Sequence, residues 1–194
     1  RWGADVSYYI PERQSEGYGL NLEALEHIIS DGAALVITVD CGISSYDIVQ
    51  AVCDRLDIII TDHHTAPPQI PPARAVINHK QPDCPYADKN LSGVGVALKL
   101  CQALWLRQHG EWYLEDLDIV ALGTVADVVP LVGENRIIVQ AGLKKMNELP
   151  NLGIHKLIEV AGLHDKTVTA GHIGFTLAPR LNAAGRVTHA TRAV

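Results

Sequence analysis

The stretch of sequence that decides the fold runs from residue 35 to residue 64, where LVITVDCG (35–42) and DIIITDHH (57–64) stand on either side of the segment 43–56. LVITV and DIIIT are short apolar runs rich in β-branched residues, which is typical of strands buried on both faces of a parallel sheet. The segment between them predicts a short helix that begins at Ser44 or Ser45 and ends at Val52. A strand, a helix and a second strand at this spacing form a right-handed βαβ unit, so we expect the two strands to be neighbours.

The alternation of strands and helices continues on both sides of this unit. Val6–Ile10 predicts an earlier strand, Asn21 is a helix N-cap, and Ala75–Asn78 predicts a further strand. After residue 90 the strand pattern fades, and helices are predicted at Val94–Gln108, Glu115–Val128, Asn135–Leu149, Leu152–Ala161 and, in part, Thr169–Asn182. The expected fold class is α/β, with a parallel Rossmann-like sheet flanked by helices and followed by a helical segment.

The composition is that of a globular chain. Of 194 residues 47% are apolar and 20% are charged, and no apolar run approaches the roughly 20 residues that span a membrane. The four cysteines form no CxxC pair, which disfavours structural zinc and indicates the reduced thiols of a cytoplasmic protein. Residues 1–131 hold 8 Lys and Arg against 18 Asp and Glu, whereas residues 132–194 hold 8 against 4. This asymmetry fits a carboxylate-rich metal site beside an anion-binding surface, although uneven surface solvation gives the same count.

Polar side chains follow both strands of the central unit at the point where each strand ends. Asp40 comes directly after the first strand, and Asp62-His63-His64 comes after the second. The carboxyl ends of neighbouring parallel strands share one edge, where ligands bind, so we expect these side chains within reach of one metal ion. A single Asp such as Asp40 is also an ordinary helix cap, whereas three polar residues at the end of an apolar strand favour a functional role.

A third carboxylate stands alone in an apolar stretch. Asp127 lies within residues 121–131, and such a carboxylate is paired, hydrogen-bonded or bound to a metal unless it reaches solvent at a helix end. Asp40, His63 and Asp127 form a mixed oxygen and nitrogen donor set that suits Mn²⁺ or Mg²⁺ better than structural zinc. Paired metals held in this way activate water against a phosphodiester.

Three segments are candidates for anion or nucleic-acid binding. Residues 177–186 place Arg180, Asn182 and Arg186 among small residues, where arginines bind phosphate through two hydrogen bonds, or where they are solvated at a packed helix end. The loop at 11–19 offers Arg13 for a phosphate and Tyr18 for a base, or is a plain surface loop. Gly93-Val94-Gly95 could cradle a phosphate at a helix start, but it lacks the third glycine of a dinucleotide fingerprint.

Taken in order, these motifs resemble those of the DHH phosphoesterases, and the Asn-Ala-Ala-Gly-Arg segment is typical of the RecJ-type members. The resemblance rests on the segments Ile10–Arg13, Glu16–Gly19, Val39–Gly42, Thr61–His64, Ser92–Ala97, Gly123–Leu131 and Pro179–Arg186. It implies that Asp40 bridges two Mn²⁺ or Mg²⁺ ions and that His63 and Asp127 are further ligands. It also implies that His64 faces the scissile phosphate and that Asp62 supports the site.

The family reaction that this resemblance implies is 5′→3′ hydrolysis of single-stranded DNA in recombination and repair. Arg180, Asn182 and Arg186 would contact the DNA backbone or tie two domains together. We expect single-stranded DNA and replication or repair proteins as partners, no membrane, and a monomer.

The same resemblance implies that parts of the family pattern lie outside this sequence. An Asp-x-Asp-type ligand cluster is expected before Arg1, and a C-terminal domain after the last residue. We therefore expect an interior fragment, with a DHH-type domain at 1–131 and a helical segment at 132–194. At least one metal position should be incomplete, so the fragment by itself is expected to be inactive.

Three alternatives stay open at this point. Other DHH phosphoesterases act on oligonucleotides, cyclic dinucleotides or pyrophosphate, but they have no close match to residues 179–186. A non-catalytic scaffold of the same fold does not need Asp40, His63 and Asp127. A dinucleotide-dependent oxidoreductase is disfavoured by the missing GxGxxG motif.

Overall fold

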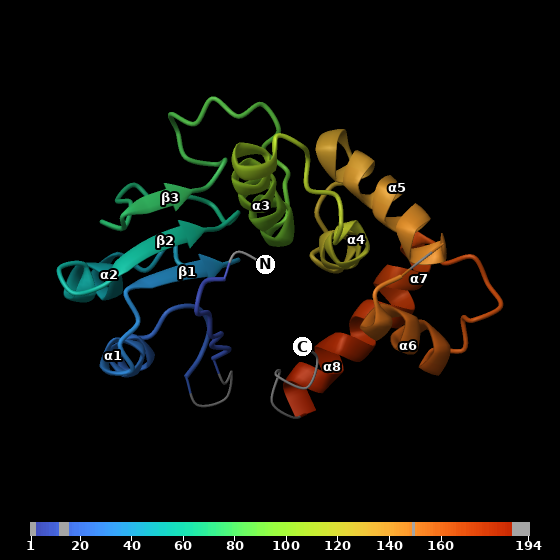
Figure 1. The fold of residues 1–194 in the computed structure, drawn as a ribbon, viewed down its shortest axis with the longest axis horizontal. Helices are drawn as coiled ribbons and strands as arrows, with labels where there is room; N and C mark the ends of the chain where they lie inside the picture. Colours follow the sequence, from blue (N-terminus) through green and yellow to red (C-terminus); the bar gives the residue numbers. More distant parts are fainter. Residues whose placement is uncertain (1–2, 12–15, 149, 188–194) are drawn as a thin grey trace.

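The computed structural model describes residues 3–11, 16–148 and 150–187, with side chains described as far as residue 183. Its strands are β1 (Leu35–Val39), β2 (Asp57–Thr61) and β3 (Ala75–Ile77). Its helices are α1 (Leu22–Ser30), α2 (Tyr46–Val52), α3 (Gly93–His109), α4 (Leu117–Ala126), α5 (Gly133–Glu148), α6 (Leu152–Val160), α7 (Ala170–His172), the π-helical segment η1 (Ile173–Leu177) and α8 (Ala178–Val187). Figure 1 shows the three strands side by side, with their arrowheads pointing toward α3 and α4.

The sheet is parallel and has the order β1-β2-β3. Val39 lies beside Thr61, and Thr61 lies beside Ile77, so all three strands end at nearly the same level. The βαβ unit and the α/β fold class expected from the sequence are therefore confirmed. The predicted strand at Ala75–Asn78 is also present and is one residue shorter.

One face of the sheet is covered by α1 and α2. Asn21 starts α1 as expected, because its side-chain oxygen accepts a hydrogen bond from the Ala24 N–H at 2.7 Å. Leu25 of α1 and Val49 of α2 pack with Ile58 and Ile60 of β2 in one buried cluster. β2 is thus the central strand and is held against α1 and α2, and its carboxyl end extends beyond this cluster.

Two expectations about strands are wrong. Val6–Ile10 forms no strand: the segment is irregular, and Val6 and Tyr8 are 79% and 69% exposed. β1 is not buried on both faces, since Leu35, Ile37 and Val39 are exposed. Both differences have one physical reason. β1 is an edge strand, and within the described residues no fourth strand pairs with it or helps to cover its outer face.

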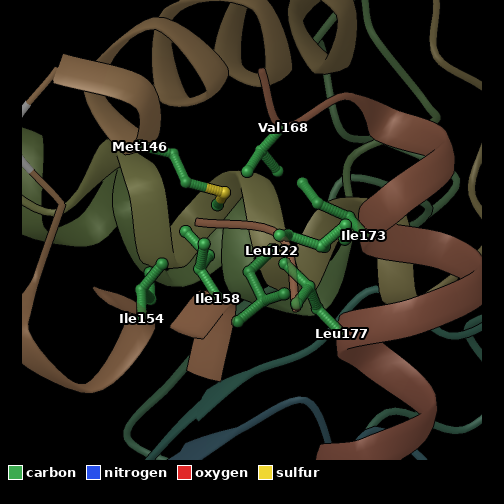
Figure 2. Packing of buried hydrophobic residues seen from close by; sticks show 8 residues of the cluster. Leu122, Met146, Ile154, Ile158, Val168, Ile173 and Leu177 are labelled. Carbon is green, nitrogen blue, oxygen red and sulfur yellow. The ribbon is translucent and has the colours of Figure 1, made fainter. Parts of the chain in front are cut away.

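The helical half packs around α4. A Cβ atom added to Gly142 of α5 would collide with the carbonyl oxygen of Leu117, so α4 and α5 lie in close contact at this glycine. Figure 2 shows the apolar cluster in which Leu122 of α4 meets Met146 of α5, Ile173 and Leu177. α4 thereby joins the helical core to the helices beside the sheet, and its C-cap residue, Asp127, reaches the sheet edge.

The predicted helices are observed with small shifts at their ends. α4 ends at Ala126 instead of Val128, because Val128 has a left-handed φ of 59°. The expected continuation of the last helix through residues 188–194 lies outside the described residues. No helix in the described part of the chain is long and apolar enough to cross a membrane. The division at residue 131 stays a prediction.

Candidate metal centre

The turn that follows β1 presents Asp40 at the carboxyl edge of the sheet. The Asp40 N–H donates to the carbonyl oxygen of Thr61 at 2.9 Å, which extends the pairing of β1 with β2 by one residue. Asp40 then leaves the strand with a φ of 63°, a left-handed conformation that Asp tolerates better than most residues. Its side chain is 52% exposed. The carboxylate is thus held at a fixed backbone position but is open to solvent and to ligands.

Asp62 is buried, and its hydrogen bonds connect the turn after β1 with the turn after β2. Its carboxylate accepts hydrogen bonds from the N–H groups of Ile43 at 2.9 Å, His63 at 2.7 Å and His64 at 3.1 Å. Its Oδ1 also lies 2.7 Å from Nδ1 of His64. Burial by itself would raise the pKa of Asp62, but these hydrogen bonds outweigh it and lower the pKa below the ordinary value. Asp62 therefore stays ionised and shapes the site without facing solvent.

His63 is the centre of the cluster. Its Nε2 lies 3.1 Å from Oδ1 of Asp40 and 3.4 Å from Oδ2 of Asp127, and its side chain is only 9% exposed. Neither imidazole nitrogen has a partner with hydrogen-bond geometry among the described residues. The Asp40 carboxylate raises the pKa of His63, burial lowers it, and the charge of Asp127 adds to the rise, so that the net direction is upward.

Asp127 lies beside His63 although it is more than sixty residues further along the chain. It is the C-cap of α4, where the helix dipole disfavours a negative charge. The next residue, Val128, is a β-branched residue with a left-handed φ, which costs on the order of 1 kcal/mol. The sequence offered two interpretations of Asp127, a paired carboxylate or a helix end that reaches solvent. The structure shows features of both: a helix end whose carboxylate is one-third exposed and lies beside His63.

His64 completes the group of possible metal ligands. One ligand atom each from Asp40, His63 and His64 can be chosen such that all lie within 4.8 Å of one another. The His64 ring stands 4.6 Å from the His63 ring, centroid to centroid, and its Nδ1 faces Asp62. Since Nδ1 is engaged by Asp62, the other ring nitrogen, Nε2, is the one available to a ligand.

The first turn of α3 closes the cluster from the side. A Cβ atom added to Gly93 would lie 2.7 Å from Cβ of Asp40 and still closer to its carboxylate. Ser92 caps α3 by accepting a hydrogen bond from the Gly95 N–H, and its hydroxyl lies 2.9 Å from that of Thr124 in α4. Gly93 is therefore needed for the close approach of α3 to Asp40, and the Ser92–Thr124 contact fixes α3 against α4.

The donor set fits a hard divalent cation. Two carboxylates flank one buried imidazole nitrogen that has no hydrogen-bond partner among the described residues, and oxygen with imidazole ligands suits Mn²⁺ or Mg²⁺. The neighbouring thiol of Cys41 is protonated at neutral pH in the metal-free protein. Burial and the charges of Asp62 and Asp40 raise the pKa of Cys41 to about 11, so it stays protonated.

Of the residues predicted to bind nucleic acid, neither Arg180 nor Asn182 has a hydrogen bond or ion pair to this cluster in the described part of the chain. Arg180 and Asn182 are exposed on α8, where Arg180 donates to the carbonyl of Thr176 at 2.7 Å. Tyr18 is 81% exposed. Arg13 lies outside the described residues, and Arg186 lies in α8 beyond the described side chains.

Sequence reasoning missed two residues that shape the site. The sequence predicts Gly93 as part of a phosphate cradle and of the motif at Ser92–Ala97, but its contact with Asp40 joins segments more than fifty residues apart. Asn78 follows β3 as Asp62 follows β2, and its side chain donates to the His64 carbonyl at 2.9 Å. The rule that polar residues follow strand ends at a functional edge, applied to the third strand, would have found Asn78.

The fold and the site define a parallel α/β domain with a carboxylate and imidazole cluster at the carboxyl edge of its sheet. The chain belongs to the DHH family, whose N-terminal domain it matches over residues 1–124.

Comparison with individual proteins gives the same family. The single-stranded-DNA-specific exonuclease RecJ of Bacillus subtilis is 45% identical over 192 residues, which cover 98% of this chain and 24% of that protein. The enzyme of the same name from Thermus thermophilus is 38% identical over 194 residues, which cover 99% of this chain and 28% of that protein. A crystal structure of exonuclease RecJ bound to manganese matches with a TM-score of 0.88 and 36% identity, over 98% of this chain and 48% of that one. The chain thus spans only about a quarter of the length of these two curated relatives.

Proposed function

We propose that this chain carries metal ligands of an exonuclease that hydrolyses single-stranded DNA in the 5′→3′ direction with Mn²⁺ or Mg²⁺. One observation carries the proposal: Asp40 and Asp127 flank a single buried nitrogen of His63 at the carboxyl edge of the sheet. The names of the relatives, which are single-stranded-DNA-specific exonucleases, support the choice of substrate. Recombination and repair in the cytoplasm are the setting in which such an activity is used.

Each residue of the cluster has its own role in this proposal. Asp40 would be a ligand shared by two ions, and His63 and Asp127 would be further ligands; bound ions would supply an activated water and neutralise charge on the attacked phosphate. His64 presents Nε2 toward the scissile phosphate because Asp62 engages Nδ1. Asp62 is a positioning residue, since its buried carboxylate fixes His64 and the backbone of both turns.

The remaining predicted residues belong to substrate binding. Arg180, Asn182 and Arg186 on α8 would contact the phosphates of the single strand, or would dock a second domain. Arg13 and Tyr18 would offer a charge and a ring to the same strand. We expect a monomer that works with replication or repair proteins, with a DHH-type domain at 1–131 and a helical segment at 132–194.

The experiment is release of nucleotides from a 5′-phosphorylated single strand in Mn²⁺, compared with a dinucleotide and with duplex DNA. It is run on the 194-residue chain and on a form extended to the length of the relatives, because the chain spans only about a quarter of that length. Asp40→Ala should abolish hydrolysis. Asp165→Ala is the matched control, because this carboxylate also pairs with an imidazole, 2.8 Å from Nε2 of His164, but on the exposed surface. Preference for the dinucleotide would favour another DHH phosphoesterase, and no hydrolysis of any substrate by the extended form would favour a scaffold.

A further inference from the structure

The third strand ends in a triplet that parallels the one after the second strand. β2 is followed by Asp62, His63 and His64, and β3 is followed by Asn78-His79-Lys80. The two strands are in register at Thr61 and Ile77, and the Asp62 N–H donates to the Ile77 carbonyl at 3.1 Å. Lys80 therefore stands at the same step beyond β3 as His64 does beyond β2, on the edge that carries the metal centre.

The turn after β3 is held rigidly against the metal centre. Asn78 is 2% exposed, and its side chain donates to the His64 carbonyl at 2.9 Å while accepting from the Lys80 N–H at 2.7 Å. His79 is 5% exposed, with Nε2 placed 3.1 Å from the Lys89 carbonyl oxygen. One buried amide thus couples the backbone of Lys80 to the backbone of His64, and Lys80 cannot drift from the site without breaking this link.

The charge of Lys80 is not neutralised at its place beside the sheet edge. Burial is the main reason why the pKa of the neighbouring His79 is lowered, and the ammonium of Lys80 acts in the same direction. Lys80 is exposed, and in the described ranges no carboxylate forms an ion pair with it. The other lysine of this loop, Lys89, differs, because it donates to the carbonyls of His79 and Cys84. Lys80 is thus an unpaired cation beside an acidic cluster.

We propose that Lys80 binds the phosphodiester held at the metal centre, donating from its ammonium to a non-bridging oxygen. The inference rests on the function proposed above and adds a residue that neither the sequence motifs nor the metal cluster includes. A lysine binds phosphate as a point charge. Lys80 is a positive group beside His64, at an edge that also carries the carboxylates of Asp40, Asp62 and Asp127. Together His64 and Lys80 would approach the phosphate from the ends of neighbouring strands, at a fixed spacing.

The test measures the binding of a 5′-phosphorylated oligothymidylate of about twelve nucleotides to the chain, in Mn²⁺ and on ice. Fluorescence anisotropy gives the affinity at each of several salt concentrations. Lys80→Gln should weaken binding by about tenfold and reduce the salt slope by about 0.7, the value for one phosphate of a single strand. Lys166→Gln is the matched control, since it removes the same charge from an exposed lysine in the loop between α6 and α7. It should leave both quantities unchanged.

A neutral methylphosphonate, moved one linkage at a time along the oligonucleotide, locates the contact. If Lys80 binds the phosphate at the metal centre, Lys80→Gln and the methylphosphonate lose less together than the sum of their separate effects, at one linkage only. Additive effects at every linkage, or equal effects of Lys80→Gln and Lys166→Gln, would overturn the assignment of Lys80 while leaving the proposed exonuclease intact. Absence of any binding, both by the unaltered chain and by the form extended to the length of the relatives, would overturn both.

Discussion

Replacement of Gly93 by Ala tests how tightly the first turn of α3 constrains the metal centre. The added Cβ atom would lie 2.7 Å from Cβ of Asp40, whereas carbon atoms pack favourably at about 3.5 Å, so one of the two must move by about 0.8 Å. Rotation of the Asp40 side chain cannot relieve this contact, because rotation about the Cα–Cβ bond leaves Cβ in place. The backbone of Asp40 or the start of α3 must shift instead.

The expected consequence is a large loss of metal affinity with a moderate loss of stability. Asp40 is fixed by its hydrogen bond to Thr61, and Gly93 is fixed through its neighbour Ser92, which contacts Thr124. Overpacking of this kind costs about 1–3 kcal/mol of unfolding free energy. Metal–ligand distances vary by only about 0.2 Å between working sites. A shift of about 0.8 Å should therefore weaken Mn²⁺ binding about tenfold to a hundredfold.

The assay is calorimetric titration with Mn²⁺ beside urea unfolding of the metal-free protein. Gly95→Ala is the control, because it lies in the same turn and its Cβ atom would lie 3.2 Å from the Ser92 hydroxyl, well away from Asp40. We expect Gly95→Ala to bind Mn²⁺ as the unaltered chain does. Equal affinity of Gly93→Ala and Gly95→Ala would refute the reasoning, since Asp40 could then not be a ligand held against α3.

Three further predictions concern single residues. Asp62→Asn should lower the unfolding free energy, measured in urea, by about 2–4 kcal/mol, because an amide cannot replace a carboxylate that accepts from three buried backbone N–H groups. The pKa of Asp62 is lowered in the folded protein, so the stabilisation from its carboxylate is present above the ordinary value of 3.8 and is lost as the pH falls through the folded pKa. Asp62→Asn should remove this dependence of stability on pH. In the metal-free protein the pKa of His63, measured by NMR, should exceed the ordinary value of 6.5, and it should fall in Asp127→Asn. Mn²⁺ binding should weaken as the pH drops through the pKa of His63, because a proton competes with the ion for Nε2. A pKa of His63 below the ordinary value would contradict this prediction. Arg180→Ala should reduce the salt slope of single-strand binding by about 0.7, and an unchanged slope would assign Arg180 to packing or domain docking.

The sheet and the cluster of carboxylates and imidazoles at its edge could be predicted because they depend on local patterns. Apolar β-branched runs that end in Asp40 and in Asp62-His63-His64 determine both the strands and the edge at which those side chains meet. Asp127 was found through its chemical setting, a lone carboxylate in an apolar stretch, although it lies more than sixty residues from His63. These inferences need only the topology of a βαβ unit and the rule that strand ends share an edge.

The remaining features depend on contacts between distant segments, which local patterns do not contain. The contact of Gly93 with Asp40 and the link from Asn78 to His64 arise only when α3 and β3 have been placed in space. The prediction of a strand at Val6–Ile10 failed for a related reason. A strand pattern states that a segment is able to pair, whereas pairing also needs a neighbouring strand.

The central claim is that Asp40, His63 and Asp127 hold a divalent metal ion between them. It is tested most directly by anomalous X-ray scattering at the manganese edge, from crystals of the chain grown with Mn²⁺. The account predicts an anomalous peak bonded to Nε2 of His63 and to the carboxylates of Asp40 and Asp127. A manganese peak at some other place, with His63 Nε2 left without a metal bond at saturating Mn²⁺, would contradict it.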